Sequence, residues 1–413
     1  MSNKRRWTVL GFVFLGIVIC YVDRGNLSIA APAMMRDFGI APAAMGVLLS
    51  AFFWTYSPFQ IPAGALVDRF GMRRSYAVAF LLWSLASAAL ALSRGTRDVI
   101  ALRMLLGLAE AIAPLASISF IRNNFAAERQ GLPTSIFIAG QNIGPALGAL
   151  VGAFLVDRLG WRMMFAITGL GALVWLPGWL AAVPAEGSRA ARGAVEVADG
   201  DTVGRPWTWG MFLASRTFWA MSICIFLSSY YWYFVLTWVP SYLIFSRGFS
   251  TLEMGRVVSL ALAAMAVVNV ASGWLADKCA ARIGVFPARL GFAVAGYIGT
   301  GAILLLPLAP QRFWALPILT LAMCSTGIGN SSFWSISQHV PPRHRVGRTV
   351  GYLNTISVSA GAVAPVITGL ILGPQKHFTP AIVVAGICPV VAAGCLLLAG
   401  SKGLEGMKAA LGG

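Results

Sequence analysis

Four ionisable side chains lie within long apolar stretches of the sequence, where a charge is costly. Asp23 and Arg24 are adjacent in the first stretch, and Arg103 and Glu110 lie seven residues apart in the fourth. A charged side chain at the centre of a membrane-spanning helix costs about 2.5–3.5 kcal/mol on insertion scales, so such residues usually face the protein interior and have a function. Two acids and two bases make this group neutral, which favours their burial together.

The chemistry that these residue types can perform is anion binding coupled to proton transfer. The planar guanidinium of arginine offers a carboxylate two parallel hydrogen bonds. A low dielectric favours the protonated form of a carboxylic acid, and a nearby arginine favours the ionised form. An incoming carboxylate that engages Arg24 or Arg103 would therefore release a partner acid to take up a proton. The alternative is a static salt-bridge network that fixes helix packing, although apolar residues would do that equally well.

Composition and hydropathy indicate that helices in a membrane position these residues. The chain has 413 residues, of which 58% are hydrophobic and 11% are charged. Repeated apolar runs of this length predict a polytopic, all-α membrane protein. The twelve transmembrane helices that we predict cover approximately 7–34, 43–67, 75–92, 98–121, 130–156, 162–183, 217–245, 251–276, 288–308, 312–338, 347–371 and 379–400.

A polar stretch divides these helices into two sets of six. We expect an N-terminal six-helix bundle over 1–183, a cytoplasmic linker over 184–216 and a C-terminal six-helix bundle over 217–413. The end of the second helix, around Asp68, is similar in sequence to the end of the eighth, around Asp277. Parallel six-helix repeats of this kind are a known transporter architecture.

The positions of the charges predict the orientation of the chain. The net charge is +17, but Lys and Arg lie in short clusters between the apolar runs, so we expect no nucleic-acid partner. With the N-terminus inside, the inner segments hold 20 of these residues and the outer segments hold 9. The positive-inside rule then places both termini in the cytoplasm. The basic start of the chain resembles a signal peptide, but no small-residue cleavage site follows it, so we expect no cleavage.

Other classes of site are not indicated. The six cysteines are scattered without a C-x-x-C pair, and we interpret them as buried structural thiols. The three histidines lie in or beside predicted loops, and the sequence contains no H-E-x-x-H, G-x-S-x-G or nucleotide-binding motif. We therefore expect no metal, no cofactor and no enzymatic activity.

Several motifs in the first half resemble those of a known family. Two loop motifs resemble the signature of the major facilitator superfamily: Gly64-Ala-Leu-Val-Asp68-Arg69-Phe-Gly71-Met-Arg73-Arg74 and Asp157-Arg-Leu-Gly160-Trp161-Arg162. Two helix motifs resemble its anion:cation symporter family: Tyr21-x-Asp23-Arg24-x-Asn26-x-Ser28-x-Ala30 and Ser50-x-Phe52-x-x-x-Tyr56-x-x-x-Gln60-x-Pro62-x-Gly64. That family includes bacterial hexuronate, galactonate and glucarate importers, and animal sialin and vesicular glutamate transporters.

The resemblance implies a major facilitator fold of two pseudo-symmetric six-helix bundles, normally a monomer, and a role for each ionisable residue. In bacterial sugar-acid members, the acids that match Asp23 and Glu110 are the protonation sites. The arginine that matches Arg103 is implied to bind the substrate carboxylate, and Arg24 is implied to pair with the acids.

Neutral polar residues are expected to bind the hydroxyl groups of a substrate. Tyr21, Tyr56, Gln141 and Asn354 fall in predicted helices that line the cavity in this superfamily. Trp334 would offer a flat face to a sugar or an aromatic acid. Each of these side chains has the alternative role of an interhelical hydrogen bond or a packing contact.

Asp68 and Arg69 are expected to act differently, because they lie at a cytoplasmic helix end. Ion pairs between helices at that position would hold the inner face shut and break when it opens. Topological anchoring is the simpler role for these charges.

The leading hypothesis is a proton-coupled symporter in the inner membrane of a bacterium, importing a small organic carboxylate by alternating access. The lipid bilayer, protons and the carboxylate are its expected partners. The alternative is proton-coupled antiport that exports a metabolite or drug, because buried arginines indicate an anionic ligand without fixing the direction of flux. Aldonates, aldarates, uronates, and aromatic or dicarboxylic acids all fit one arginine and several neutral polar groups.

Overall fold

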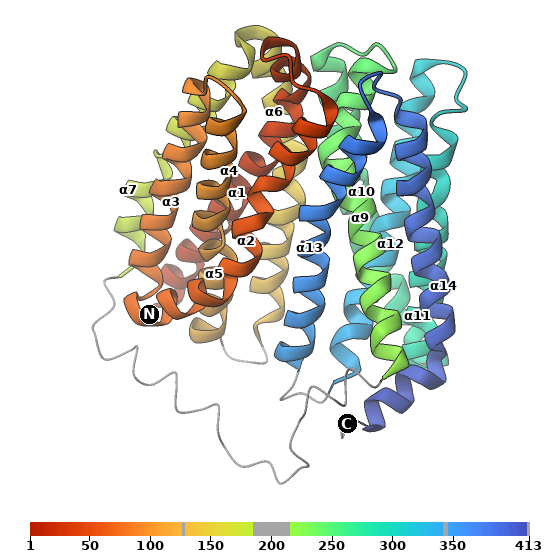
Figure 1. The fold of residues 1–413 in the computed structure, drawn as a ribbon. Coiled ribbons are helices and arrows are strands. Elements are labelled where there is room, and N and C mark those ends of the chain that lie inside the picture. Colours follow the sequence, from red (N-terminus) through yellow and green to blue (C-terminus); the bar gives the residue numbers. More distant parts are fainter. Residues whose placement is uncertain (126–128, 185–214, 342–345, 411–413) are drawn as a thin grey trace. The chain divides into compact units, whose positions relative to one another are not determined.

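The structure is a computed structural model that describes residues 1–125, 129–184, 215–341 and 346–410 (Figure 1). Throughout these residues the regular structure is helical, as predicted. The first half contains α1 (Asn3–Asp37), α2 (Pro42–Phe70), α3 (Met72–Ala89), η1 (Leu90–Leu92), α4 (Thr96–Glu110), α5 (Ile112–Asn124), α6 (Gly131–Ala172) and α7 (Trp175–Ala182). The second half contains α9 (Arg216–Phe245), α10 (Thr251–Ile283), α11 (Val285–Thr300), η3 (Gly301–Leu305), η4 (Arg312–Trp314), α12 (Ala315–His339), α13 (Val346–Leu372) and α14 (Phe378–Ala410).

The lengths of these helices agree with the predicted spans. Within the described residues, ten helical segments are long and apolar enough to cross a membrane. We count α2 as a further span, because it has 29 residues and its charged side chains, Asp68 and Arg69, lie at its end. The segment Leu132–Ala182 contains two predicted spans, and the backbone breaks between them at Gly160, where φ is 81°. Each of the twelve predicted ranges therefore falls largely on helical residues of the described chain.

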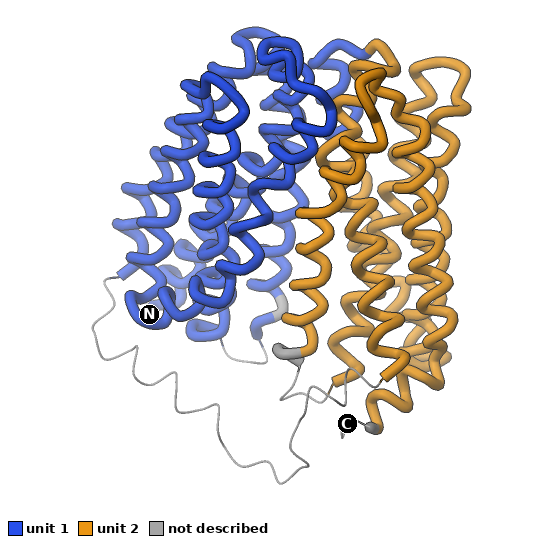
Figure 2. Tube along the Cα trace, in the orientation of Figure 1, with its two compact units in different colours: residues 1–201, 249–259 blue, residues 202–248, 260–413 orange. Residues whose placement is uncertain are grey.

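The chain divides into two compact units (Figure 2). Unit 1 comprises residues 1–201 and 249–259, and unit 2 comprises 202–248 and 260–413. Most of the predicted linker, 184–216, lies outside the described residues.

Glycine residues allow close helix packing in unit 1. A Cβ on Gly144 of α6 would lie 2.5 Å from the Cβ of Tyr21 on α1, so only glycine permits this approach. On α4, a Cβ at Gly107 would lie 2.1 Å from the carbonyl oxygen of Phe52 on α2. Gly107, which lies between Arg103 and Glu110, thus permits a close approach of α2 to α4. These two contacts bring α1, α2, α4 and α6 together around the predicted charges.

Unit 2 has an aromatic and aliphatic core at one end of its bundle. Phe218 of α9, Tyr297 of α11 and Phe333 of α12 are fully buried there. The backbone turns at Gly400, where φ is 61°, and the last part of α14 then packs Leu404 against the same cluster.

Backbone turns repeat between the two units. Gly39 follows α1 with φ 64°, and Gly248 follows α9 with φ 66°. Gly71 precedes α3 with φ 79°, and Gly284 precedes α11 with φ 93°. Positive φ favours glycine, so these matched turns extend the internal repeat that the sequence predicts.

Candidate functional site

Glu110 lies at a break in the fourth predicted span. Helix α4 ends at Glu110, and α5 begins at Ile112. Pro114 has no backbone N–H and cannot donate to the carbonyl of Glu110, four residues earlier. The break therefore follows from the sequence, and it leaves a carboxylate at the end of a half-helix inside an apolar span.

The Glu110 carboxylate forms a buried ion pair with Arg24 of α1. The distance from Arg24 Nε to Glu110 Oε2 is 2.8 Å, and the Glu110 side chain is completely buried. The thiol of Cys20 donates to the same oxygen at 3.1 Å. Glu110 Oε1 is buried and has no hydrogen-bond partner among the described residues. One oxygen thus takes both contacts, and the other is buried without one.

Three aromatic rings surround the Arg24 guanidinium. Its carbon lies 4.5 Å from the ring centre of Tyr21, 4.3 Å from that of Tyr56 and 5.1 Å from that of Phe52. Cation–π contacts of this kind stabilise a guanidinium that is removed from water. The structure therefore brings together Tyr21, Tyr56, Arg24 and Glu110, four of the residues that the sequence singles out.

Arg103 also contacts one of these three rings, that of Phe52. Its guanidinium carbon is 5.1 Å from the centre of the Phe52 ring, and the residue is 2% exposed. Its Nε and Nη1 atoms are buried and have no hydrogen-bond partner within the described residues. A buried guanidinium with two N–H groups of this kind is suited to bind an anion, because both groups can donate to it.

Asp23 lies in a different set of contacts from Glu110. Its Oδ1 atom accepts from Asn26 Nδ2 at 3.2 Å and from Ser87 Oγ of α3 at 3.1 Å. The Asn26 amide also donates to Thr168 Oγ1 of α6 at 3.1 Å. Asp23 is 2% exposed, and all these partners are neutral.

The implied pairing of Arg24 with both acids is therefore found for Glu110 and is wrong for Asp23. Adjacent residues on a helix point about 100° apart. Arg24 consequently faces α2 and α4, whereas Asp23 faces α3 and α6. The ion pairs Arg24–Glu110 and Arg289–Asp277 include neither Asp23 nor Arg103.

Sequence reasoning missed Cys20, Ser87 and Thr168 as partners of the acids. Cys20 lies four residues before Arg24, and this spacing on a helix indicates a shared face. That signal was available in the sequence. Ser87 and Thr168 are single hydroxyl residues in apolar spans, and nothing distinguishes them from other such residues.

The remaining predicted binding residues are partly buried. Gln141 lies on α6, three residues before Gly144, and its backbone carbonyl loses its helical donor because Pro145 has no N–H. In unit 2, Asn354 lies on α13. Trp334 lies on α12, with its ring 5.8 Å from that of Phe333 in an edge-to-face contact.

The predicted gate residues are exposed at the end of α2. Asp68 and Arg69 both lie on the surface of unit 1, and Arg69 lies over the Phe70 ring at 5.3 Å. In unit 2, Asp277, the residue that matches Asp68, accepts from Arg289 of α11.

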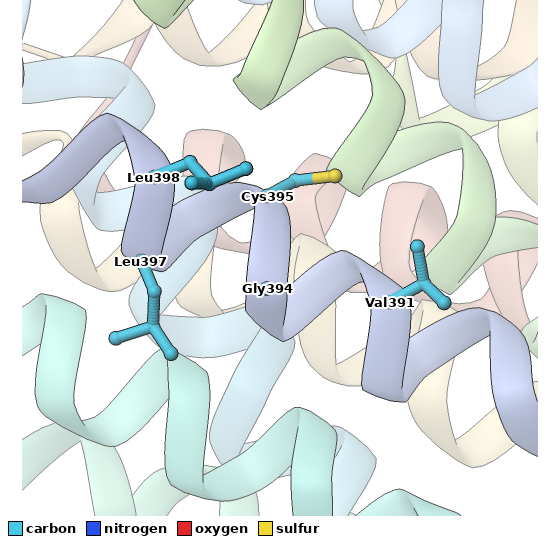
Figure 3. Close-up of a pocket in the computed structure, with 5 residues that line it drawn as sticks. All are labelled: Val391, Gly394, Cys395, Leu397 and Leu398. Atoms are coloured by element: carbon cyan, nitrogen blue, oxygen red, sulfur yellow. The ribbon is translucent and has the colours of Figure 1, made fainter.

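Two further features do not resemble binding sites for a polar ligand. An apolar groove of about 520 Å³ on α14 is lined by Val391, Gly394, Cys395, Leu397 and Leu398, with no charged group (Figure 3). Across the described part of the chain, no three His, Cys, Asp or Glu residues gather in a way that could hold a metal ion.

The family of the chain follows from comparison with known sequences. A model of the Major Facilitator Superfamily matches residues 13–365. The chain belongs to the major facilitator superfamily. Its fold is therefore the one that the sequence motifs imply, and its function class is transport rather than catalysis.

This superfamily member is similar to bacterial transporters along nearly its whole length. It is 26% identical over 390 residues to the hexuronate transporter of Bacillus subtilis, covering 94% of this chain and 92% of that protein. It is 27% identical over 422 residues to the D-galactonate transporter of Escherichia coli O6:H1, covering 96% of each. A probable galactarate/D-glucarate transporter of E. coli K12 is 29% identical, covering 95% of this chain and 92% of that protein.

Solved structures support the fold of this transporter. A bacterial homolog of the human lysosomal transporter Spinster, in an inward-facing and unoccupied conformation, matches with a TM-score of 0.76 at 16% identity, covering 100% of this chain and 98% of that chain. A D-xylose–proton symporter matches with a TM-score of 0.72 at 18% identity, covering 94% of this chain and 97% of that chain.

Proposed function

We propose that this chain is a proton-coupled symporter that imports a small organic carboxylate, such as a sugar acid, across the cytoplasmic membrane of a bacterium. The observation that carries the proposal is the buried Arg24–Glu110 pair at 2.8 Å, which links a group that can bind an anion to a group that can bind a proton. Transport of hexuronate, galactonate and glucarate by similar proteins supports the substrate class.

The coupling follows from exchange of partners. While Arg24 is bonded to Glu110, the ionised carboxylate is stabilised by an opposite charge. An incoming carboxylate that draws Arg24 away leaves Glu110 buried without its directly bonded cation, and burial favours the protonated form. Substrate and proton then bind together, which is the requirement for symport.

In this proposal, Arg103 binds the substrate carboxylate. Its buried N–H groups without protein acceptors would form charge-assisted hydrogen bonds with an anion. Tyr21, Tyr56 and Gln141 are the neutral groups of unit 1 that we assign to substrate hydroxyls. Asn354 and Trp334 are those of unit 2.

Asp23 is the second proton site of the proposal. Its contacts are donors from Asn26 and Ser87, which are neutral, so its proton is not exchanged directly for an arginine. We therefore propose that Glu110 changes its protonation when the substrate binds. Asp23 changes its protonation later, when α1 moves against α3 and α6.

We keep the orientation that the charges predict, with both termini in the cytoplasm, and the monomeric state that the family resemblance implies. Asp68 and Arg69 are then cytoplasmic, where we assign them to the inner gate. Replacing Asp68 with Asn should increase the labelling of residues in the transport cavity by a reagent added on the cytoplasmic side. Unchanged labelling would leave these two residues as anchors only.

The experiment that tests the proposal is uptake into proteoliposomes of the purified protein. The probes are D-galactonate, D-glucuronate and D-glucarate, each under an inward proton gradient, an inward sodium gradient or no gradient. We expect accumulation of at least one probe only with the proton gradient. Glu110→Gln should abolish accumulation while exchange of labelled for unlabelled substrate continues. Glu405→Gln, which removes an exposed carboxylate on α14, is the matched control and should behave as the unmodified protein.

Other results of the uptake experiment would contradict proton coupling or favour antiport over symport. Accumulation without a proton gradient, or with sodium alone, would contradict proton coupling. Accumulation driven by an outward proton gradient would replace symport with antiport, the alternative that the sequence leaves open.

A further inference from the structure

We propose that Cys20 is a positioning residue for Glu110, and that its thiol holds the carboxylate in place when Arg24 moves to the substrate. The inference deepens the proposed function, because it assumes that Glu110 exchanges Arg24 for a proton. Cysteines in membrane helices usually behave as small apolar side chains. The contacts of Cys20 distinguish it from that default.

The thiol contacts both members of the ion pair. Cys20 Sγ lies 3.1 Å from Glu110 Oε2, the same oxygen that receives Arg24 Nε at 2.8 Å. Arg24 Nη2 lies 3.7 Å from the same sulfur. Cys20 and Glu110 are both completely buried. The three groups therefore form a closed triangle in which sulfur donates to the acid and accepts from the base.

The two α1 residues differ in how firmly they hold Glu110. Cys20 and Arg24 are four residues apart on one continuous helix and so share a face. A cysteine side chain has one flexible torsion before its sulfur, whereas the arginine guanidinium is carried on a long, flexible stem. When Arg24 turns toward an incoming anion, the thiol stays at Oε2. Glu110 therefore keeps its orientation during the step in which it gains or loses a proton.

The choice of sulfur rather than oxygen has a physical consequence. A thiol is a weak hydrogen-bond donor, and hydrogen bonds to the ionised form of an acid favour that form. A serine hydroxyl at this position would donate more strongly. Cys20 thus orients Glu110 with less bias toward ionisation than serine would impose.

Other groups face the pair from the neighbouring helices, and they stay constant when Cys20 is changed. These charged or titratable side chains are Tyr21, Asp23, Tyr56, Tyr76 and Arg103, from α1, α2, α3 and α4.

The first test observes the hydrogen bond itself and does not require transport. Infrared spectroscopy of the purified protein detects the S–H stretch, and subtracting the spectrum of Cys20→Ala isolates the band of Cys20. Glu110→Gln should shift this band, because the amide is a weaker acceptor than the carboxylate. Glu405→Gln should leave it unchanged. A Cys20 band that is the same with Glu110 and with Gln at that position would overturn the inference, whatever the transport result.

The second test measures proton-driven uptake as a function of pH. We expect Cys20→Ser to keep uptake while its pH profile moves to more acidic values. Cys20→Ala should lower the maximal rate about fivefold, which corresponds to the free energy of one hydrogen bond. The KM for substrate exchange should stay the same. Cys224→Ser and Cys224→Ala are the matched controls, because Cys224 of α9 is also completely buried.

The controls decide the result. If the Cys20 variants behave as the Cys224 variants do in rate and pH profile, Cys20 is a packing residue and the inference is overturned. If Glu110→Gln retains proton-driven accumulation, the proposed function fails, and the infrared band then shows whether the Cys20–Glu110 bond exists independently of coupling.

Discussion

The interiors of the two units differ in the kind of polar group that they bury. Unit 1 buries Asp23, Arg103 and Glu110, with Arg24 only 16% exposed beside them. Unit 2 contains buried or partly buried hydrogen bonds between neutral side chains: Ser229 to Ser357 at 2.7 Å, Tyr230 to Thr368 at 3.3 Å, Thr300 to Thr326 at 3.1 Å, and Tyr297 to Asn330 at 3.1 Å. Its buried arginine, Arg289, pairs with an exposed acid, Asp277, where α10 meets α11.

This difference separates two roles within one repeated architecture. A contact between charged groups changes strength when either group gains or loses a proton, whereas a bond between two hydroxyls does not. Proton-dependent switching is therefore expected in unit 1, and proton-independent packing in unit 2. The predictions below test that division, beginning with the largest effect.

The first prediction concerns the charge pair of unit 1. Arg24→Ala leaves Glu110 buried without a cation, and breaking a buried pair in this way costs about 3–5 kcal/mol. We expect a large fall in the thermal unfolding temperature, measured by tryptophan fluorescence in detergent. The loss should be smaller at acid pH, because a protonated Glu110 needs no cation. The double variant Arg24→Ala, Glu110→Gln should be more stable than Arg24→Ala alone.

The control for this prediction is Arg97→Ala, which removes an exposed arginine from the same helix as Glu110. Such a surface change should alter stability by about 0.5 kcal/mol or less. Equal losses in the two variants would mean that the Arg24–Glu110 pair contributes no more than a surface charge.

The second prediction compares the buried arginines of the two units. Arg103→Lys keeps the charge but loses the bidentate geometry that suits a carboxylate. We expect the KM for the transported carboxylate to rise about 10-fold or more, which corresponds to about 1.4 kcal/mol. Arg289→Lys in unit 2 should leave this KM unchanged, because Arg289 already binds Asp277. An unchanged KM in the Arg103 variant would assign anion binding elsewhere.

The sequence predicted the helices and one charge contact, and it did so for identifiable reasons. Long apolar runs define spans regardless of tertiary packing, so the twelve ranges correspond to helices. Glu110 and Arg24 are each expensive to bury alone, so a pair between their helices was a sound expectation. The helix break at Glu110 was not predicted, because 98–121 is predicted as one span, although Pro114, four residues later, is a signal for it.

The partners of Asp23 were not predictable in the same way. The sequence shows that a charge is buried but not toward which neighbour it points, because that depends on the rotation and packing of α1. Ser87 and Thr168 come from α3 and α6, distant in sequence, and only the packed bundle brings them to Asp23. The roles of Asn354 and Trp334 stay predictions, since their contacts within unit 2 do not specify a ligand.

The last prediction has the smallest effect and compares serine hydrogen bonds in the two units. Ser357→Ala in unit 2 removes a bond between two hydroxyls, and Ser87→Ala in unit 1 removes a donor to Asp23. Each loss should cost about 0.5–1.5 kcal/mol in unfolding free energy. The cost in the Ser357 variant should be the same at acid and neutral pH, because neither hydroxyl titrates. The cost in the Ser87 variant should increase as the pH rises, because the lost donor matters more to an ionised Asp23 than to a protonated one. Thermal unfolding of both variants across pH measures the difference, and parallel pH curves would contradict the division between a proton-sensitive unit 1 and a proton-insensitive unit 2.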